Sequence, residues 1–233
     1  MAKEKFFKSK ETEEGTEVEI GSKKIIGAGD FGVASSADVN IAGRLRKFVV
    51  KEFGTNYDAE EAFKNYRNAR AAGLKVFNTY RIDQTGRNIL MSSVLDPNKI
   101  VIGSNDPIRS LKERKLKLKE GVTNLDEFLG EYFKQAEIAS VNDISIDRAD
   151  VPFFIIDKNN DETQLDFVLA DMDNVKKTKF AIDNITRRSI YEKNVLMLEI
   201  ALREFFNNNF SSSCSYFSAI DHYVDNLVFS SRK

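Results

Sequence analysis

The sequence predicts an α+β fold in which an antiparallel sheet with one helix is followed by a short, mainly helical part. Short β-branched runs separated by turn residues extend to Phe53, and a helical pattern follows over residues 58–72. A longer helical pattern covers residues 124–140. We therefore expect one bilobal domain with a polar N-terminal tail at 1–17, a first lobe at 18–95 and a second lobe at 96–233.

The composition is that of an ordinary globular protein with a sizeable core. The 233 residues are 42% hydrophobic and include 18 Phe, and 35 Lys and Arg side chains nearly balance 36 Asp and Glu. This balance gives no overall field that would attract nucleic acid, so no nucleic-acid partner is expected. One cysteine and one histidine exclude an internal disulfide and most zinc sites. Without a leader or a run of 18 apolar residues, we expect a cytoplasmic protein with no membrane span.

Runs of β-branched and aromatic residues on both sides of the first helix predict a small antiparallel sheet. The runs after the helix flank a turn at residues 84–87 and should form a hairpin. The strands are expected at residues 18–20, 24–26, 37–41, 46–53, 79–82 and 88–95.

A G-x-G-x-x-G turn lies between two of these runs and could bring the backbone close to a phosphate, because glycine has no Cβ. The small, β-like run after it, and Lys51 at 19 positions beyond Gly32, favour a β-hairpin flap over the helix N-terminus of a dinucleotide site. The alternative is a structural hairpin beside a surface lysine. The residues that would form the turn are Gly27, Ala28, Gly29, Phe31 and Gly32.

The helix at 58–72 is expected to begin at an Asp58 N-cap and to end before Gly73 as its C′ residue. Two glutamates, Glu60 and Glu61, lie in its first turn. Glu61 follows Asp58 by three positions and could instead close a capping box.

Six basic residues lie within residues 109–119. This run is typical of a solvated helix face, and the alternative is a patch that recognises an anionic substrate. No aromatic residue is interleaved, which disfavours a nucleic-acid platform.

The helix at 124–140 carries a clear apolar stripe opposite a polar face and is expected to be buried in the second lobe. Two further apolar helices are predicted at 190–206 and 217–228. The stripe of the first comprises Leu125, Phe128, Leu129, Tyr132, Phe133, Ala136 and Ala139.

The succession of these elements resembles the protein-kinase-like fold over residues 18–205. The glycine loop and the lysine strand Val49-Val50-Lys51 are followed by a helix, a hairpin, a long helix, an Asp-bearing loop and an Asp-x-Asp motif. The chain looks most like the compact atypical kinases of bacteria or viruses. The resemblance implies ATP and Mg²⁺ as cofactors.

In the first lobe, the resemblance implies that the glycine loop covers the phosphates and that Lys51 holds the α- and β-phosphates. Glu60 or Glu61 would pair with Lys51. Met91 would lie in the gatekeeper region and Ser93 in the hinge that contacts the adenine, although Met91 could also be a simple core residue.

In the second lobe, the resemblance implies that Asp147 is the catalytic residue that orients an attacking hydroxyl. Asp171 would bind Mg²⁺, and Asp173 would supply a second oxygen ligand. The chain departs from the family pattern at Ser145, where a histidine is expected, and at Pro152, where a metal-binding asparagine is expected. Asp147 could alternatively begin a turn.

The sequence therefore leads us to expect an ATP- and Mg²⁺-dependent phosphotransferase whose acceptor is an unknown protein or small molecule. An alternative is a pseudokinase that acts as a nucleotide-binding or protein-interaction module. A third interpretation is an unrelated α+β domain with a structural glycine turn.

Overall fold

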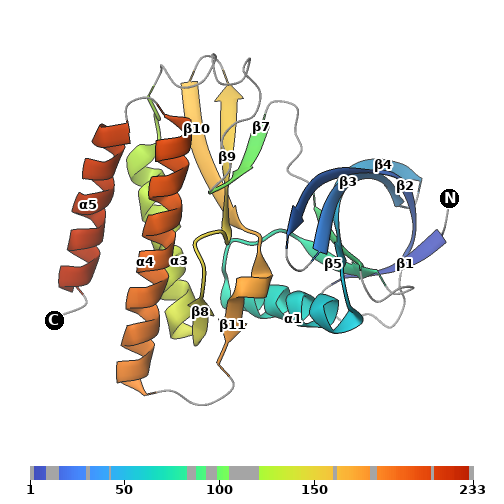
Figure 1. Cartoon of the computed structure of the whole chain (residues 1–233), viewed down its shortest axis with the longest axis horizontal. Helices are drawn as coiled ribbons and strands as arrows, with labels where there is room; N and C mark the ends of the chain where they lie inside the picture. Colours follow the sequence, from blue (N-terminus) through green and yellow to red (C-terminus); the bar gives the residue numbers. More distant parts are fainter. Residues whose placement is uncertain are drawn as a thin grey trace. The chain divides into compact units, whose positions relative to one another are not determined.

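The computed structural model describes residues 3–8, 16–29, 32–41, 43–82, 88–92, 99–104, 121–159, 162–178, 183–210 and 213–230. The chain forms two compact units, Met1–Arg70 with Val76–Asp96 and Ala71–Lys75 with Pro97–Lys233 (Figure 1). Antiparallel strands and one helix come first, and small sheets with longer helices follow, so the predicted α+β class is confirmed. The predicted lobe boundaries stay predictions.

The first unit is built on antiparallel strands that close into a barrel in the order β1-β2-β3-β4-β6-β5 (Figure 1). Its interior holds a small cluster of Ala37, Val39, Phe48 and Val50, against which Ile20 and Tyr80 pack. The strands are β1 (Lys3–Lys8), β2 (Thr16–Gly29), β3 (Gly32–Ile41), β4 (Arg44–Phe53), β5 (Thr79–Ile82) and β6 (Asn88–Ser92).

Two strands of the barrel differ from the sequence-based expectation. Lys3–Lys8, within the expected polar tail, forms β1 and pairs with both β2 and β5. The two short strands expected at 18–20 and 24–26 form the single strand β2, with register shifts between Ile20 and Lys23 and between Ile25 and Gly27. The segment Lys3–Lys8 has four charged residues among its six and gives little strand signal of its own, so its pairing with β2 and β5 orders it. In β2 the register shifts join the two expected strands into one.

Helix α1 (Asn56–Ala72) begins two residues earlier than expected because Thr55, not Asp58, caps it. The Asp58 amide donates to Thr55 Oγ1 at 3.1 Å, and the Thr55 hydroxyl donates to Asp58 Oδ2 at 2.6 Å. Thr55 is therefore the N-cap residue, and its hydroxyl also binds the side chain of Asp58, the third helical residue. At the other end, Gly73 has a φ of +90°, which confirms it as the C′ glycine.

The second unit contains a three-stranded sheet in the order β10-β9-β7, a two-stranded sheet β11-β8, and helices that pack on one another. None of the helices in the described part of the chain combines the length and apolar character that a membrane span needs. The elements are β7 (Lys99–Gly103), α3 (Leu125–Val141), β8 (Ile144–Ile146), β9 (Pro152–Asn159), β10 (Glu162–Leu169), η1 (Met172–Asn174), β11 (Val175–Lys177), α4 (Asn184–Asn209) and α5 (Ser213–Ser230).

An aromatic core joins α3 and α4 to the three-stranded sheet. Tyr132 of α3 lies 5.0 Å from Phe167 and 5.6 Å from Phe154 between ring centroids, and Phe154 stacks on Phe205 of α4 at 4.2 Å. The Tyr132 hydroxyl donates to the carbonyl of Leu198 at 3.0 Å, and complete burial raises the pKa of this phenol well above its ordinary value. The apolar stripe predicted for residues 124–140 is therefore the buried face of α3.

A fully buried asparagine of α4 holds strand β8 in place. The backbone amide of Ile146 donates to Asn194 Oδ1 at 2.7 Å, and Asn194 Nδ2 donates to the carbonyl of Ile144 at 2.9 Å. The side chain thus satisfies one donor and one acceptor of the strand edge that faces α4. Because Asp147 directly follows β8, this clamp also determines where Asp147 lies.

Replacing Asn194 with alanine should lower the free energy of unfolding by about 2–3 kcal/mol, since two buried backbone groups lose their partners. Urea denaturation would measure the change. Asn208→Ala, at an exposed position of the same helix, should be close to neutral. Equal stability of the two variants would show that β8 does not depend on the clamp.

Candidate functional site

The G-x-G-x-x-G turn lies at the end of a β-hairpin, as the sequence predicts. Gly27 of β2 is opposite Ala34 of β3, and Gly29 is opposite Gly32, with residues 30 and 31 between the two strands. Ala28 is exposed. Phe31 lies outside the described residues, so its predicted contact with nucleotide stays a prediction.

The third glycine of the turn is required by the close approach of two strands. A Cβ on Gly32 would lie 2.1 Å from the backbone carbonyl oxygen of Glu52 on β4. Gly32 is paired with Phe53 at the end of β4, so the obstacle is backbone and not a flexible side chain. Gly32 therefore has a structural role in addition to any role at a phosphate.

Lys51 lies on the same row of the sheet as the first glycine. Gly27 is opposite Ala34, Ala34 is opposite Lys51, and Lys51 is opposite Ile89 of β6. At the usual strand spacing, the Cα atoms of Gly27 and Lys51 are about 10 Å apart. The Lys51 ammonium lies 5.0 Å from the centre of the Phe53 ring, two residues along the same strand.

The two candidate partners of Lys51 lie in the first turns of α1. Glu60 is exposed, and Glu61 forms an ion pair with Lys64 at 3.6 Å. The capping-box alternative for Glu61 is wrong, because Thr55 and Asp58 form the cap. The pairing of Lys51 with either glutamate stays a prediction.

The predicted adenine contacts are described only in part. Met91 lies on β6, opposite Val49 of β4 and Thr79 of β5, which places it on the strand next to the lysine strand. Ser93 and the basic run at 109–119 lie outside the described residues.

Asp147 follows β8 and is held by side chains from two directions. Ser145 Oγ donates to Asp147 Oδ1 at 2.7 Å, and Lys193 Nζ of α4 donates to the same oxygen at 2.6 Å. Lys176 of β11 lies 3.9 Å from the other oxygen, Oδ2. One carboxylate oxygen therefore has two close donors, while the second faces a more distant and largely exposed ammonium.

These contacts keep Asp147 ionised. Partial burial pushes its pKa upward, but the hydrogen bonds from Lys193 and Ser145 and the charges of Lys193 and Lys176 outweigh burial. The pKa of Asp147 therefore lies below its ordinary value of 3.8. At neutral pH this carboxylate can accept a hydrogen bond from an incoming hydroxyl group.

Asp171 and Asp173 flank the buried Met172, and only Ala170 separates Asp171 from the end of strand β10. Both aspartates are half-buried, and Asn174 Nδ2 donates to Asp171 Oδ2 at 3.4 Å. In the part of the chain that the structure describes, no group of three or more His, Cys, Asp or Glu side chains gathers in a metal-binding arrangement. A divalent ion here would need further oxygen ligands from a substrate or water.

The loops that carry Asp147 and Asp171 are hydrogen-bonded to each other. The amide of Asp147 donates to the carbonyl of Asn174 at 2.8 Å, and the amide of Ala170 donates to the carbonyl of Val151 at 3.0 Å. Asn174 thus contacts Asp147 through its backbone and Asp171 through its side chain. Asp147 and Asp171, which the sequence analysis singled out, therefore lie on neighbouring loops although they are distant along the chain.

Pro152 begins strand β9, opposite Leu169 at the end of β10. It is buried and offers no side-chain oxygen, while the neighbouring Val151 carbonyl contacts the loop that leads to Asp171. The position where the kinase-like pattern places an asparagine therefore lies beside Asp171 but supplies no side-chain ligand.

Sequence reasoning missed Lys193 and Asn194, the adjacent α4 residues that hold Asp147 and β8. One signal was available for Asn194, a polar residue within an apolar helical stripe. Lys193 gave none, because a lysine next to a buried position is normally a solvated residue.

Comparison with protein-family models finds no match, and comparison with curated proteins finds no significant relative.

Replacing Gly32 with alanine should destabilise the first unit by about 1–3 kcal/mol with or without nucleotide, because the added Cβ meets a strand backbone. Gly54→Ala is the matched control, since a Cβ there meets nothing within 4 Å. Denaturation of both variants tests this, and a Gly32→Ala protein as stable as the control would contradict the packing argument.

The low pKa of Asp147 should make the protein more stable above the ordinary carboxyl pKa of 3.8, and this contribution should be lost as pH falls through the folded-state value. Lys193→Met should raise the pKa of Asp147 and reduce the loss. NMR titration of the Asp147 carboxyl carbon would measure its pKa in both proteins. Lys177→Met, at an exposed position on β11, should leave the titration unchanged, whereas an unchanged titration in Lys193→Met would contradict the ion pair.

Proposed function

We propose that the chain is an atypical kinase-like phosphotransferase that uses ATP and Mg²⁺. The observation that carries the proposal is the hydrogen-bonded pair of loops bearing Asp147 and Asp171. Transfer of a phosphoryl group needs one carboxylate to orient the attacking hydroxyl and others to hold the metal that binds the phosphates.

The order of elements in the first unit supports this assignment. The glycine hairpin β2–β3 precedes the lysine strand β4, helix α1 follows it, and the hairpin β5–β6 pairs with β4 on its other side. This order is the one that the kinase-like resemblance requires. In the proposal, the backbone of the hairpin binds phosphate and Lys51 contributes a fixed positive charge.

The second unit supports the assignment through its own sequence of elements. Helix α3 is followed by β8 and the Asp147 loop, then by the hairpin β9–β10 and the Asp171 loop. Strand β11 returns to pair with β8. This pairing places the segments before Asp147 and after Asp171 side by side, so the two aspartates belong to one folded region.

The contacts of Asp147 suggest separate roles for its two oxygens. Oδ1 accepts hydrogen bonds from Ser145 and Lys193, which hold the carboxylate in place. We therefore assign Oδ2 as the oxygen that contacts the acceptor hydroxyl. In the transfer, a bond forms between the hydroxyl oxygen and the γ-phosphorus, the bond from that phosphorus to the β,γ-bridging oxygen breaks, and ADP leaves, while the hydroxyl proton passes late in the step to Asp147 Oδ2. The low pKa favours orientation of the hydroxyl over early removal of its proton.

The residues present fit a magnesium ion that is held largely by the substrate. Asp171 and Asp173 offer hard oxygen ligands, and Mg²⁺ commonly binds one or two carboxylates together with phosphates and water. When bound, the ion would neutralise charge on the transferring phosphoryl group.

A second candidate is a pseudokinase that binds nucleotide or protein without phosphoryl transfer. It is favoured by Pro152, which leaves one expected metal ligand missing, and by the close engagement of Asp147 with Lys193. It predicts that Asp147→Asn retains the cellular function of the protein.

ATP with Mg²⁺ should raise the melting temperature by about 5 °C at concentrations well above the dissociation constant, because a ligand that binds the folded state stabilises it. Lys51→Ala and Asp171→Ala should each abolish the metal-dependent part of this increase. Differential scanning fluorimetry with ATP, ADP and Mg²⁺ measures the effect.

Lys47→Ala, on the same strand as Lys51, and Asp225→Ala, on the exposed face of α5, are matched controls that should keep the response. No increase at millimolar nucleotide would refute both nucleotide-binding candidates and favour a structural glycine turn. If the control variants lost the increase in melting temperature as well, the increase would depend on the overall charge of the protein and not on the proposed site.

A further inference from the structure

A serine hydroxyl of the chain itself contacts the carboxylate that is proposed to orient the acceptor. Ser145 Oγ donates to Asp147 Oδ1 at 2.7 Å, and a catalytic aspartate orients an attacking hydroxyl through a hydrogen bond of this kind. Because Ser145 uses its proton in this bond, the lone pairs of Oγ are left for a bond to phosphorus. Ser145 therefore has the first property that a phosphate acceptor needs.

The position of Ser145 on strand β8 directs its side chain away from the core. Its neighbours Ile144 and Ile146 are almost completely buried, whereas Ser145 is half-buried. Successive side chains of a strand point to opposite faces, so the Ser145 hydroxyl lies on the outer face of β8. A phosphate on this hydroxyl would not have to enter the core.

Two ammonium groups lie beside the same hydroxyl. Lys176 of β11 is directly opposite Ser145 in the ladder with β8, so the two side chains share a face with their Cβ atoms about 5 Å apart. Lys193 Nζ of α4 donates at 2.6 Å to the Asp147 oxygen that Ser145 also contacts. The Lys176 and Lys193 side chains are 68% and 46% exposed, so both have room to turn toward a phosphate on Ser145. Their charges would stabilise it.

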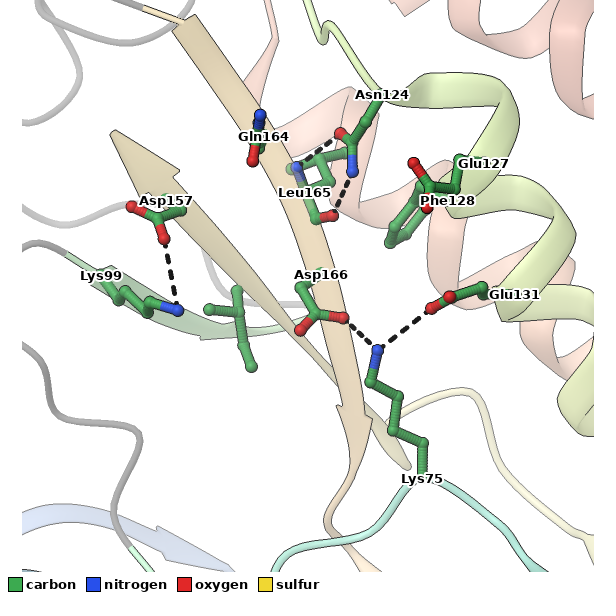
Figure 2. Close-up of a pocket in the computed structure, with 11 residues that line it drawn as sticks. Lys75, Lys99, Asn124, Glu127, Phe128, Glu131, Asp157, Gln164, Leu165 and Asp166 are labelled. Atoms are coloured by element: carbon green, nitrogen blue, oxygen red, sulfur yellow. Dashed lines mark hydrogen bonds and ion pairs between the residues drawn. The ribbon is translucent and has the colours of Figure 1, made fainter. Parts of the chain in front are cut away.

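A second cluster of lysine and carboxylate groups in the same unit lacks such a hydroxyl. Figure 2 shows Lys75 between Asp166 and Glu131, at 2.5 and 3.2 Å, in a cavity next to the start of α3. No Ser, Thr or Tyr is among the described residues that line this cavity, so they offer no hydroxyl to a phosphoryl group. The cluster at Asp147 differs because a hydroxyl donates into its carboxylate.

We propose that Ser145 is a phosphate acceptor, and that the protein phosphorylates itself at this residue when no other acceptor is bound. The inference rests on the proposed phosphotransferase activity and names one acceptor for it. A bond forms between Ser145 Oγ and the γ-phosphorus of ATP, the bond from that phosphorus to the β,γ-bridging oxygen breaks, and ADP leaves. The hydroxyl proton passes late in the step to Asp147 Oδ1 and then to water. Another acceptor would use Asp147 Oδ2, so one carboxylate serves both hydroxyls.

Incubation of the full chain with ATP and Mg²⁺, followed by peptide mass spectrometry, tests the proposal directly. Phosphate should be found on Ser145 of the wild type. Ser145→Ala should lose this modification, and Asp147→Asn should reduce it at least about tenfold. Ser215→Ala, at an exposed position of α5, should be modified like the wild type. Thr55, whose hydroxyl also donates to an aspartate, is an internal control and should carry no phosphate.

The outcomes separate this inference from the proposed function. Mg²⁺-dependent ADP formation by a wild type whose Ser145 stays unmodified would overturn the assignment of Ser145 and leave the phosphotransferase in place. No ADP formation by a protein whose melting temperature rises with ATP would overturn both. Equal modification of Ser145 in the wild type and in Asp147→Asn, or equal modification of Thr55 and Ser145, would overturn the selection of Ser145 by Asp147.

A second measurement does not depend on transfer from ATP. The full chain is produced with phosphoserine incorporated at position 145 during translation, and the phosphate is titrated by phosphorus NMR. Lys176→Met should move the midpoint of this titration to higher pH by about half a unit, because loss of a nearby cation favours the protonated phosphate. Lys177→Met, opposite Ile144 on the same strand as Lys176, is the matched control. Equal midpoints in the two variants would overturn the proposed contact between Lys176 and the phosphate.

Discussion

The candidate site in the second unit depends on the two hydrogen bonds that Asn194 makes to strand β8. They fix the strand that precedes Asp147, and the neighbouring Lys193 fixes the carboxylate itself. Helix α4 can provide both contacts because its buried face is anchored by Phe205, which stacks on Phe154 of the sheet at 4.2 Å. An apolar core thus positions a polar site, and the cost of burying Asn194 is offset by the hydrogen bonds that its amide oxygen and nitrogen make to β8.

In the first unit, a comparable constraint acts on the glycine hairpin. Gly32 allows β3 to approach the Glu52 carbonyl on β4, and this pairing places Lys51 on the row of Gly27. The same glycine can therefore serve the barrel and a phosphate site, and its presence alone does not distinguish between them. Each unit holds its candidate groups through backbone pairing, which gives them fixed positions before any ligand binds.

The features that could be predicted from sequence are those set by local patterns. The apolar stripe of α3, the C′ role of Gly73 and the hairpin at the glycine turn follow from periodicity and from glycine chemistry. The features that could not be predicted depend on partners far along the chain. Strand β1 is polar and is ordered by β2 and β5, and the ion pair between Lys193 and Asp147 joins residues 46 positions apart. The Thr55 cap was missed because Asp58, three residues later, is itself a common N-cap residue.

The rate of Mg²⁺-dependent ADP formation by the wild type and by Asp147→Asn, each shown to bind ATP, tests the proposed phosphoryl transfer most directly. If Asp147 orients the acceptor hydroxyl, the wild type should form ADP and a phosphorylated product, and Asp147→Asn should form them about 100-fold or more slowly while it keeps nucleotide binding. Asp150→Asn, in the same loop, serves as the matched control. Equal rates in the wild type and Asp147→Asn would contradict the orienting role of Asp147, and binding without any turnover would contradict the phosphotransferase and leave the pseudokinase.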